Sequence, residues 1–104
     1  MNLQETANCL AELGHETRLT IFRHLVKMGK TGVSVGEIQK ELNIPASTLS
    51  HHISRLVRVE LVKQVRYGRT LVCVSQYEKL QGILDFLLEE CCEGETCIEV
   101  SCCE

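Results

Sequence analysis

The chain has 104 residues, of which 44% are hydrophobic and 24% are charged, as expected for one globular domain with a modest core. This composition excludes a largely disordered chain, and no apolar run is long enough to span a bilayer. The N-terminal residues lack a basic start followed by an apolar stretch, so we expect a cytoplasmic protein without a secretory signal.

The net charge of −3 conceals two regions of opposite sign. Residues 1–75 carry ten Lys and Arg against six Asp and Glu, whereas residues 76–104 carry one Lys against eight acids. Five of the seven cysteines also lie after residue 90. The basic region could bind a polyanion, and the acidic region rich in thiols could bind a cation.

Apolar residues at helical spacing predict two helices at the start of the chain. The first runs from about Asn2 to Leu13, and Gly14 is placed to stop it. The second lies within residues 15–30 and ends near Gly29. Its expected inward residues are Leu19, Phe22, Leu25 and Val26.

Two shorter helices follow, at about residues 34–42 and 47–59. Ser34 with Glu37 three residues later predicts a capping box at the start of the first. Pro45 disfavours a helical conformation at Ile44, and Ser47 is expected to cap the second helix. Two short helices joined by a tight turn form the helix-turn-helix pattern.

The remainder predicts a β-hairpin and a last helix. Two β-branched runs flank Tyr67 and Gly68, and this glycine can supply the hairpin turn. The pattern of residues 75–92 then predicts a helix. Its complete apolar stripe consists of Leu80, Ile83, Leu84, Leu87 and Leu88.

The outer face of the predicted helix at 47–59 is rich in hydrogen-bonding groups and has no acid before Glu60. Hydroxyl groups can reach phosphates and bases, and arginine can read guanine, so this face suits the major groove of DNA. Its members are Ser47, Thr48, Ser50, His51, His52, Ser54, Arg55 and Arg58. The hairpin tip adds a basic arm for a backbone or minor groove, formed by Lys63, Arg66, Tyr67 and Arg69.

The segments "LGHETRLTIFRHL", "STLSHHISRL" and "VRYGR" resemble the hallmark segments of the ArsR/SmtB metalloregulatory repressors, over about residues 7–88. The resemblance implies a mainly α fold, an α+β winged helix-turn-helix with about five helices and a two-stranded hairpin wing. It also implies a homodimer, paired through the first and last helices, that binds operator double-stranded DNA. Two departures from the family are Glu60, where it usually has Gly, and Cys73, where it usually has Tyr.

A dimer is also expected from the helices themselves, since their apolar stripes are wide for a monomer of this size to cover. A two-fold dimer would present two recognition helices to half-sites about one turn of DNA apart. We therefore divide the chain into a DNA-binding and dimerisation domain at 1–92 and a cysteine-rich tail at 93–104.

Two ligand sites of the resembled family are excluded by this sequence. Ser34 and Gly36 stand where one site has its cysteines, and residues 77–90 contain no His for the zinc site of the last helix. The segment "CCEGETC" resembles the C-terminal arsenite site of one branch. The predicted ligands are therefore Cys91, Cys92 and Cys97, with Cys102 and Cys103 as accessory thiols.

Three thiolates without a nearby His suit trivalent arsenic, whereas zinc prefers four ligands. Soft thiolate sites also select Sb(III), Cd(II) or Pb(II), and a methylated As(III) needs only two thiolates. We expect no obligatory cofactor, and As(III) as the inducer of a repressor. A thiol-redox or persulfide sensor and a metallothionein-like buffer fused to a DNA-binding domain are the alternatives.

Catalysis is not expected, because no set of nucleophile, base and orienting group is evident. The two remaining cysteines, Cys9 and Cys73, lie at apolar-leaning positions and are expected to be small core residues.

Overall fold

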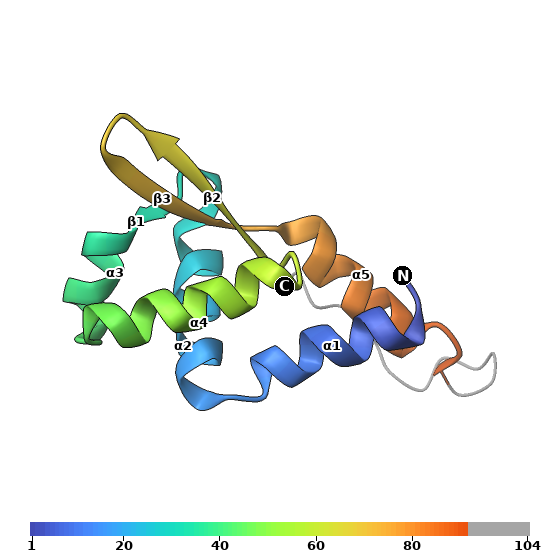
Figure 1. Ribbon diagram of the computed structural model, residues 1–104. Coiled ribbons are helices and arrows are strands. Elements are labelled where there is room, and N and C mark those ends of the chain that lie inside the picture. Colours follow the sequence, from blue (N-terminus) through green and yellow to red (C-terminus); the bar gives the residue numbers. More distant parts are fainter. Residues whose placement is uncertain (92–104) are drawn as a thin grey trace.

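The computed structural model describes residues 1–91, which form five α-helices around a small antiparallel sheet (Figure 1). This arrangement confirms the predicted mainly helical winged helix-turn-helix. Residues 92–104, which include the predicted tail, lie outside the described part. The elements in chain order are α1 (Leu3–Leu13), α2 (Glu16–Met28), the 3₁₀ turn η1 (Gly29–Thr31), β1 (Val33–Ser34), α3 (Val35–Leu42), α4 (Ala46–Arg58), β2 (Val62–Tyr67), β3 (Thr70–Ser75) and α5 (Tyr77–Leu88).

Side-chain caps mark the starts of α1, α2 and α3, at Asn2, His15 and Ser34. The Glu5 N–H donates to Asn2 Oδ1 over 2.8 Å at the start of α1, and the Glu37 N–H donates to Ser34 Oγ over 3.2 Å at the start of α3. The second bond confirms the predicted role of Ser34. The predicted cap at Ser47 is wrong, because α4 already begins at Ala46 with Pro45 at the N-cap position.

The sheet has three strands in the order β1-β3-β2, one more than the predicted hairpin. β3 lies between its two antiparallel neighbours, with Cys73 opposite Val33 on one side and Gln64 on the other. Gly32 allows β1 to approach β3, since it has a φ of +76° and a Cβ there would lie 2.7 Å from Val72 Cγ1. β1 has only two residues, which is too short for an alternating pattern that would predict a strand from the sequence.

The core lies between the helices and one face of the sheet. It contains Cys9, Ile21, Phe22, Leu25, Val33, Ile38, Leu49, Ile53, Leu56, Leu61, Val62, Cys73 and Ile83. Cys9 and Cys73 are thus buried, as predicted. Leu19, however, is 42% exposed, which contradicts the inward placement predicted for it. Ile21 lies about 200° further round α2 and takes the buried position instead.

The inward face of α1 includes two polar residues, while some of its apolar residues face outward. Thr6 and Glu12 are buried together with Cys9, whereas Leu3 and Leu10 are 73% and 41% exposed. The neighbouring helix α5 shows a related division. Ile83 is buried, but three leucines of its stripe are 40–56% exposed, namely Leu84, Leu87 and Leu88. The two helices contact each other and together leave an uncovered apolar surface, which we call the α1/α5 surface.

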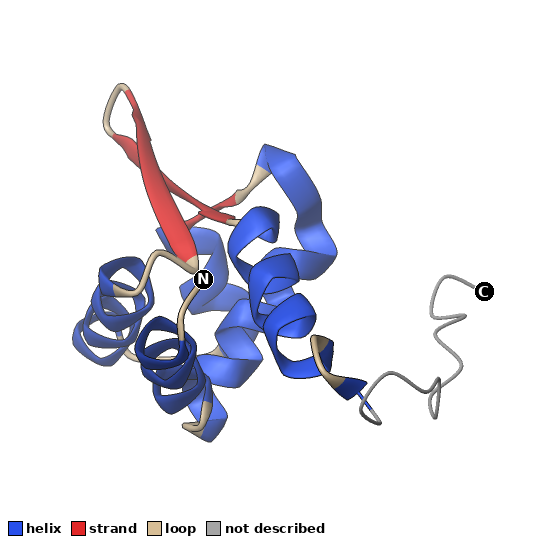
Figure 2. Cartoon of the chain, turned by 90° about the vertical axis from the view of Figure 1, so that its right-hand side faces the viewer, coloured by secondary structure: helices blue, strands red, loops and turns tan. Residues whose placement is uncertain are grey.

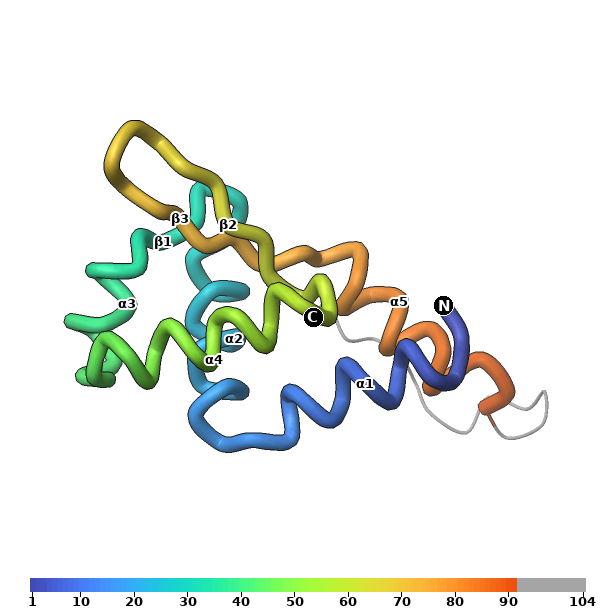
Figure 3. The backbone as a smooth tube through the Cα atoms, viewed as in Figure 1, coloured from blue at the N-terminus to red at the C-terminus, as the bar shows by residue number. Residues whose placement is uncertain are grey.

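The elements are distributed along the length of the molecule. The turn between α3 and α4 and the tip of the β2–β3 hairpin lie toward one end (Figures 1 and 3). The N-terminus and the end of α5 lie toward the other. A view from the side shows the hairpin projecting beyond the helices as a wing (Figure 2). The turn of the helix-turn-helix and the tip of the wing therefore lie at the opposite end of the molecule from the N-terminus and the end of α5.

Candidate nucleic-acid interface

One face of α4 presents short polar and basic side chains to solvent. They recur at positions i, i+3, i+4, i+7 and i+11, the spacing that gathers residues on one side of a helix. They are Ser47, Ser50, His51, Ser54 and Arg58, and Thr48 beside them is also exposed. The opposite face packs Leu49, Ile53 and Leu56 into the core. The core thus fixes α4 with its polar face outward.

The wing supplies a second set of exposed groups. Gly68 has a φ of +62°, which allows the tight turn between β2 and β3. Arg66, Tyr67 and Arg69 are exposed beside this turn, whereas Lys63, which was predicted to lie at the hairpin tip, is exposed near the start of β2 opposite Val74. These cations project with the hairpin, where they can approach a duplex that lies against α4.

A hollow separates α4 from the wing, and polar groups from both elements line it. Ser50 and Ser54 contribute from α4, and Arg66 and Arg69 contribute from the wing. Hydroxyl and guanidinium groups are common ligands of DNA phosphates. The hollow therefore connects the polar face of α4 with the basic wing. No acidic residue is among the residues that line it.

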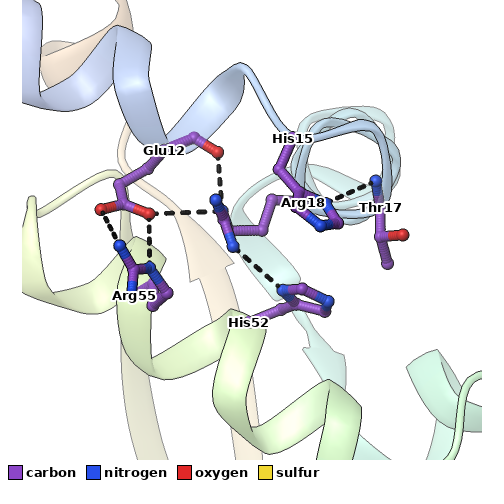
Figure 4. Close-up of polar contacts among 6 residues, drawn as sticks. All are labelled: Glu12, His15, Thr17, Arg18, His52 and Arg55. Carbon is purple, nitrogen blue, oxygen red and sulfur yellow. Dashed lines mark hydrogen bonds and ion pairs between the residues drawn. The ribbon is translucent and has the colours of Figure 1, made fainter.

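The predicted outer-face position of His52 is wrong. Its side chain is 7% exposed, and its Nδ1 lies 3.2 Å from Arg18 Nη1 (Figure 4). The His15 ring lies 4.8 Å away between centroids. Burial, and then the neighbouring His15 and Arg18, lower the pKa of His52. Because the guanidinium can only donate, Nδ1 accepts the hydrogen bond and the imidazole is neutral in this arrangement.

Arg55 is also turned away from the centre of the exposed face. Arg55 Nε lies 2.8 Å from Glu12 Oε1, and Arg55 Nη2 lies 3.2 Å from Glu12 Oε2, a bidentate pair between α4 and α1 (Figure 4). The side chain of Arg55 is 37% exposed, whereas that of Glu12 is only 10% exposed. Arg55 therefore stands at the edge of the polar face, anchored on one side and open to solvent on the other.

Glu12 is the centre of a network of ion pairs and hydrogen bonds that was not predicted from the sequence. Arg18 Nε donates to the Glu12 backbone carbonyl over 2.8 Å and also lies 3.3 Å from Glu12 Oε1. The hydrogen bond from Arg55 is the main cause that lowers the pKa of Glu12 and raises the pKa of Arg55. A buried carboxylate is thus neutralised by two guanidinium groups, and the network joins α1, α2 and α4.

The predicted thiol site lies mostly outside the described residues. Cys91 is half-buried just beyond α5, while Cys92, Cys97, Cys102 and Cys103 fall beyond residue 91. Within residues 1–91, no three His, Cys, Asp or Glu side chains are grouped so as to hold a metal ion. Burial raises the pKa of Cys9 and of Cys73, so these two thiols are poor nucleophiles and poor ligands.

The exposed polar helix, the tight turn before it and the basic wing define a winged helix-turn-helix DNA-binding protein. The sequence profile described as "Helix-turn-helix domain" matches residues 13–65, and the chain belongs to that family. No helix within the described range has the length and apolarity that crossing a membrane requires. Among curated proteins, none matches the chain significantly.

Solved structures of similar fold include several transcriptional regulators. The "ArsR-like Transcriptional Regulator from Rhodococcus sp. RHA1" is 25% identical with a TM-score of 0.72, over 84% of this chain and 78% of that one. The transcriptional repressor PagR of Bacillus anthracis is 29% identical with a TM-score of 0.68, over 82% and 94%. The transcriptional repressor BigR from Xylella fastidiosa is 28% identical with a TM-score of 0.66, over 86% and 88%. Family and fold place this chain among helix-turn-helix DNA-binding proteins, and the solved structures that it is similar to are transcriptional regulators.

Proposed function

We propose that this protein is a homodimeric repressor that binds operator DNA and releases it when trivalent arsenic binds cysteine thiolates after α5. The observation that carries the proposal is the separation of two surfaces on one domain. A polar and basic surface on α4 and the wing suits DNA, and the apolar α1/α5 surface suits a second copy of the chain. The thiols begin directly beyond α5, next to the proposed dimer interface.

The apolar α1/α5 surface supports the dimer. Met1, Leu3 and Leu10 from α1 and its start are exposed beside Leu84 and Leu87 from α5. Covering such a surface in water is favourable in proportion to the apolar area removed. Two-fold pairing would use the same surface on both copies and would place two recognition helices on one face of the duplex.

The chemistry of the donor set supports arsenic as the inducer. Cys91, Cys92 and Cys97 offer three soft ligands, and the segment between them contains no His. As(III) takes three sulfur ligands and leaves the fourth direction to its lone pair, whereas a structural zinc site closes with four ligands. Sb(III) and methylated As(III) share this preference for sulfur and are the related inducers to compare.

Release of DNA needs a free-energy coupling between the two ligands of about 1–3 kcal/mol, the usual size for an allosteric protein. A chelate that draws Cys92 and Cys97 toward Cys91 would constrain the chain at the end of α5. In a dimer paired through α5, a small shift of that helix changes the separation of the two copies of α4. Two recognition helices that no longer match the spacing of their half-sites lose operator affinity.

The experiment begins with an operator selected by the wild-type protein from a library of random duplexes. Operator binding is then followed by fluorescence anisotropy during an arsenite titration under excess reductant. We expect wild-type protein to release the DNA, and Cys91→Ser, Cys92→Ser and Cys97→Ser variants to bind the DNA but not release it. The matched controls are Cys102→Ser and Cys103→Ser, which should respond nearly as wild type does.

Four results would contradict parts of the proposal. If the selection enriches no sequence, the chain is not a sequence-specific repressor. If arsenite binds but wild type stays on the operator, the tail is a buffer rather than a sensor. If release occurs only without reductant, the protein senses thiol oxidation instead. Release by the Cys97→Ser protein but not by the Cys102→Ser protein would reassign the third ligand.

A further inference from the structure

The bidentate pair between Glu12 and Arg55 leaves three of the five N–H groups of the guanidinium without a bond to Glu12. Arginine has five N–H groups in a rigid plane, and Glu12 accepts one from Nε and one from Nη2. The remaining three include a parallel pair, one on Nη1 and one on Nη2, at the end of the side chain. Among the hydrogen bonds of residues 1–91, none uses Nη1 of Arg55. A second fork is therefore available for another acceptor.

The position of Arg55 decides which acceptor this fork can meet. The centre of the exposed face of α4 is held by Ser50, His51 and Ser54, and Arg55 lies at its border on the side of α1. Arg55 also belongs to the last turn of α4, whereas helices of this kind usually read bases with their N-terminal residues. A group at the border and C-terminal end of such a helix meets the sugar–phosphate backbone along the groove. Phosphate oxygens match the fork of a guanidinium.

We infer that Glu12 is a positioning residue for DNA binding, which fixes Arg55 so that its second fork meets a phosphate at the border of the major groove. This inference rests on the proposed function and adds a residue from α1 to the machinery of α4. A side chain held by two hydrogen bonds loses less rotamer freedom when it binds than a free one does. The buried Glu12 is itself held from the other side by Arg18, so the support continues into α2.

Simple electrostatics makes the opposite prediction. Removing a carboxylate near the DNA surface raises the local positive potential and should tighten binding to a polyanion. A Glu12→Gln variant therefore separates the two explanations, because it removes the charge and keeps the size of the side chain. The matched control is Glu5→Gln. Glu5 is a carboxylate on the same helix whose ion pair, over 3.4 Å, is with Lys79 of α5 rather than with Arg55.

The test is a double-mutant cycle on DNA affinity with Glu12→Gln, Arg55→Ala and the double variant. All are measured at a temperature where melting curves show each protein to be folded. The probes are the selected operator and a scrambled duplex of about 30 base pairs, which is long enough for two half-sites one turn apart. We expect Glu12→Gln to weaken binding about fivefold in the wild-type background and not at all in the Arg55→Ala background.

The salt dependence identifies the acceptor. Arg55→Ala should reduce the slope of log affinity against log salt concentration by about two, one for each copy in the dimer, and weaken both duplexes by the same factor. Loss on the selected operator alone would show a base contact and overturn the assignment to phosphate. A Glu12→Gln variant that matches Glu5→Gln, or that binds more tightly, would overturn the positioning role while leaving the repressor intact. Failure of wild type to bind either duplex would overturn the proposed function as well.

Discussion

Leu84 gives a direct test of the α1/α5 surface. The residue is 46% exposed in the single chain, so about half of its burial remains to be gained in a dimer. Full burial of a leucine stabilises by about 1.5–3 kcal/mol, so the remaining half contributes about 1 kcal/mol per copy and about 2 kcal/mol per two-fold interface. Leu84→Ala should therefore raise the dimer dissociation constant about thirtyfold.

Leu84→Asp should have a larger effect, since it also places two unpaired carboxylates in an apolar interface. We expect a monomer that no longer holds an operator with two half-sites. Sedimentation velocity over a range of protein concentrations measures the mass, and anisotropy measures DNA binding. The control is Leu19→Asp, a substitution at a leucine of similar exposure, 42%, on α2. A Leu84→Asp protein with the mass of the wild-type dimer, or a Leu19→Asp protein that dissociates equally, would refute this assignment of the interface.

Three further predictions concern the body of the domain. Glu12→Gln should lower the free energy of unfolding by about 2 kcal/mol near pH 7, because it weakens hydrogen bonds to two charged groups. The pKa of Glu12 is lowered in the folded state, so this contribution is present above its ordinary pKa of 4.5 and disappears as the pH falls through the lowered value. Urea denaturation at several pH values should show that the free energies of unfolding of the two proteins become equal in acid. Gly32→Ala should lower the melting temperature sharply, since a Cβ would lie 2.7 Å from Val72 Cγ1 and the φ of Gly32 is +76°. An unchanged melting temperature in calorimetry would contradict the close approach of β1 to β3. Cys9 and Cys73 should resist iodoacetamide in the native protein and react only after denaturant is added, as peptide mass spectrometry can show.

The sequence was sufficient for the elements whose signals are local. The cap at Ser34, the break at Pro45 and the turn at Gly68 each act within a few residues, and the helices and hairpin follow from them. Glu60 has a φ of +65°, which gives a physical reason for the glycine that the resembled family usually has there. Position alone predicted the burial of Cys9 and Cys73, because each lies within an apolar pattern.

The burial of His52 and the ion pair of Arg55 were both missed on α4, for different reasons. His52 lies three residues after Leu49 and four before Leu56, so a helical wheel drawn around those leucines would have predicted its burial. Arg55 is different, because its partner Glu12 is 43 residues away and no local pattern connects the two. The sequence also gives the positions of the cysteines after α5, and their role as ligands stays a prediction.

The exposure of Leu3 and Leu10 on the outward face of α1 has a consequence for folding. Cys9, Glu12 and Leu13 provide part of its attachment to the domain, whereas Leu3 and Leu10 contribute little until a second chain covers them. In the proposed dimer, the stability of the folded chain should then depend on protein concentration by mass action. Dilution would lower the melting temperature, and hydrogen exchange would show the amides of α1 opening before those of α2 and α4. Since Glu12 would leave together with α1, a chain that loses its partner would also release the clamp on Arg55.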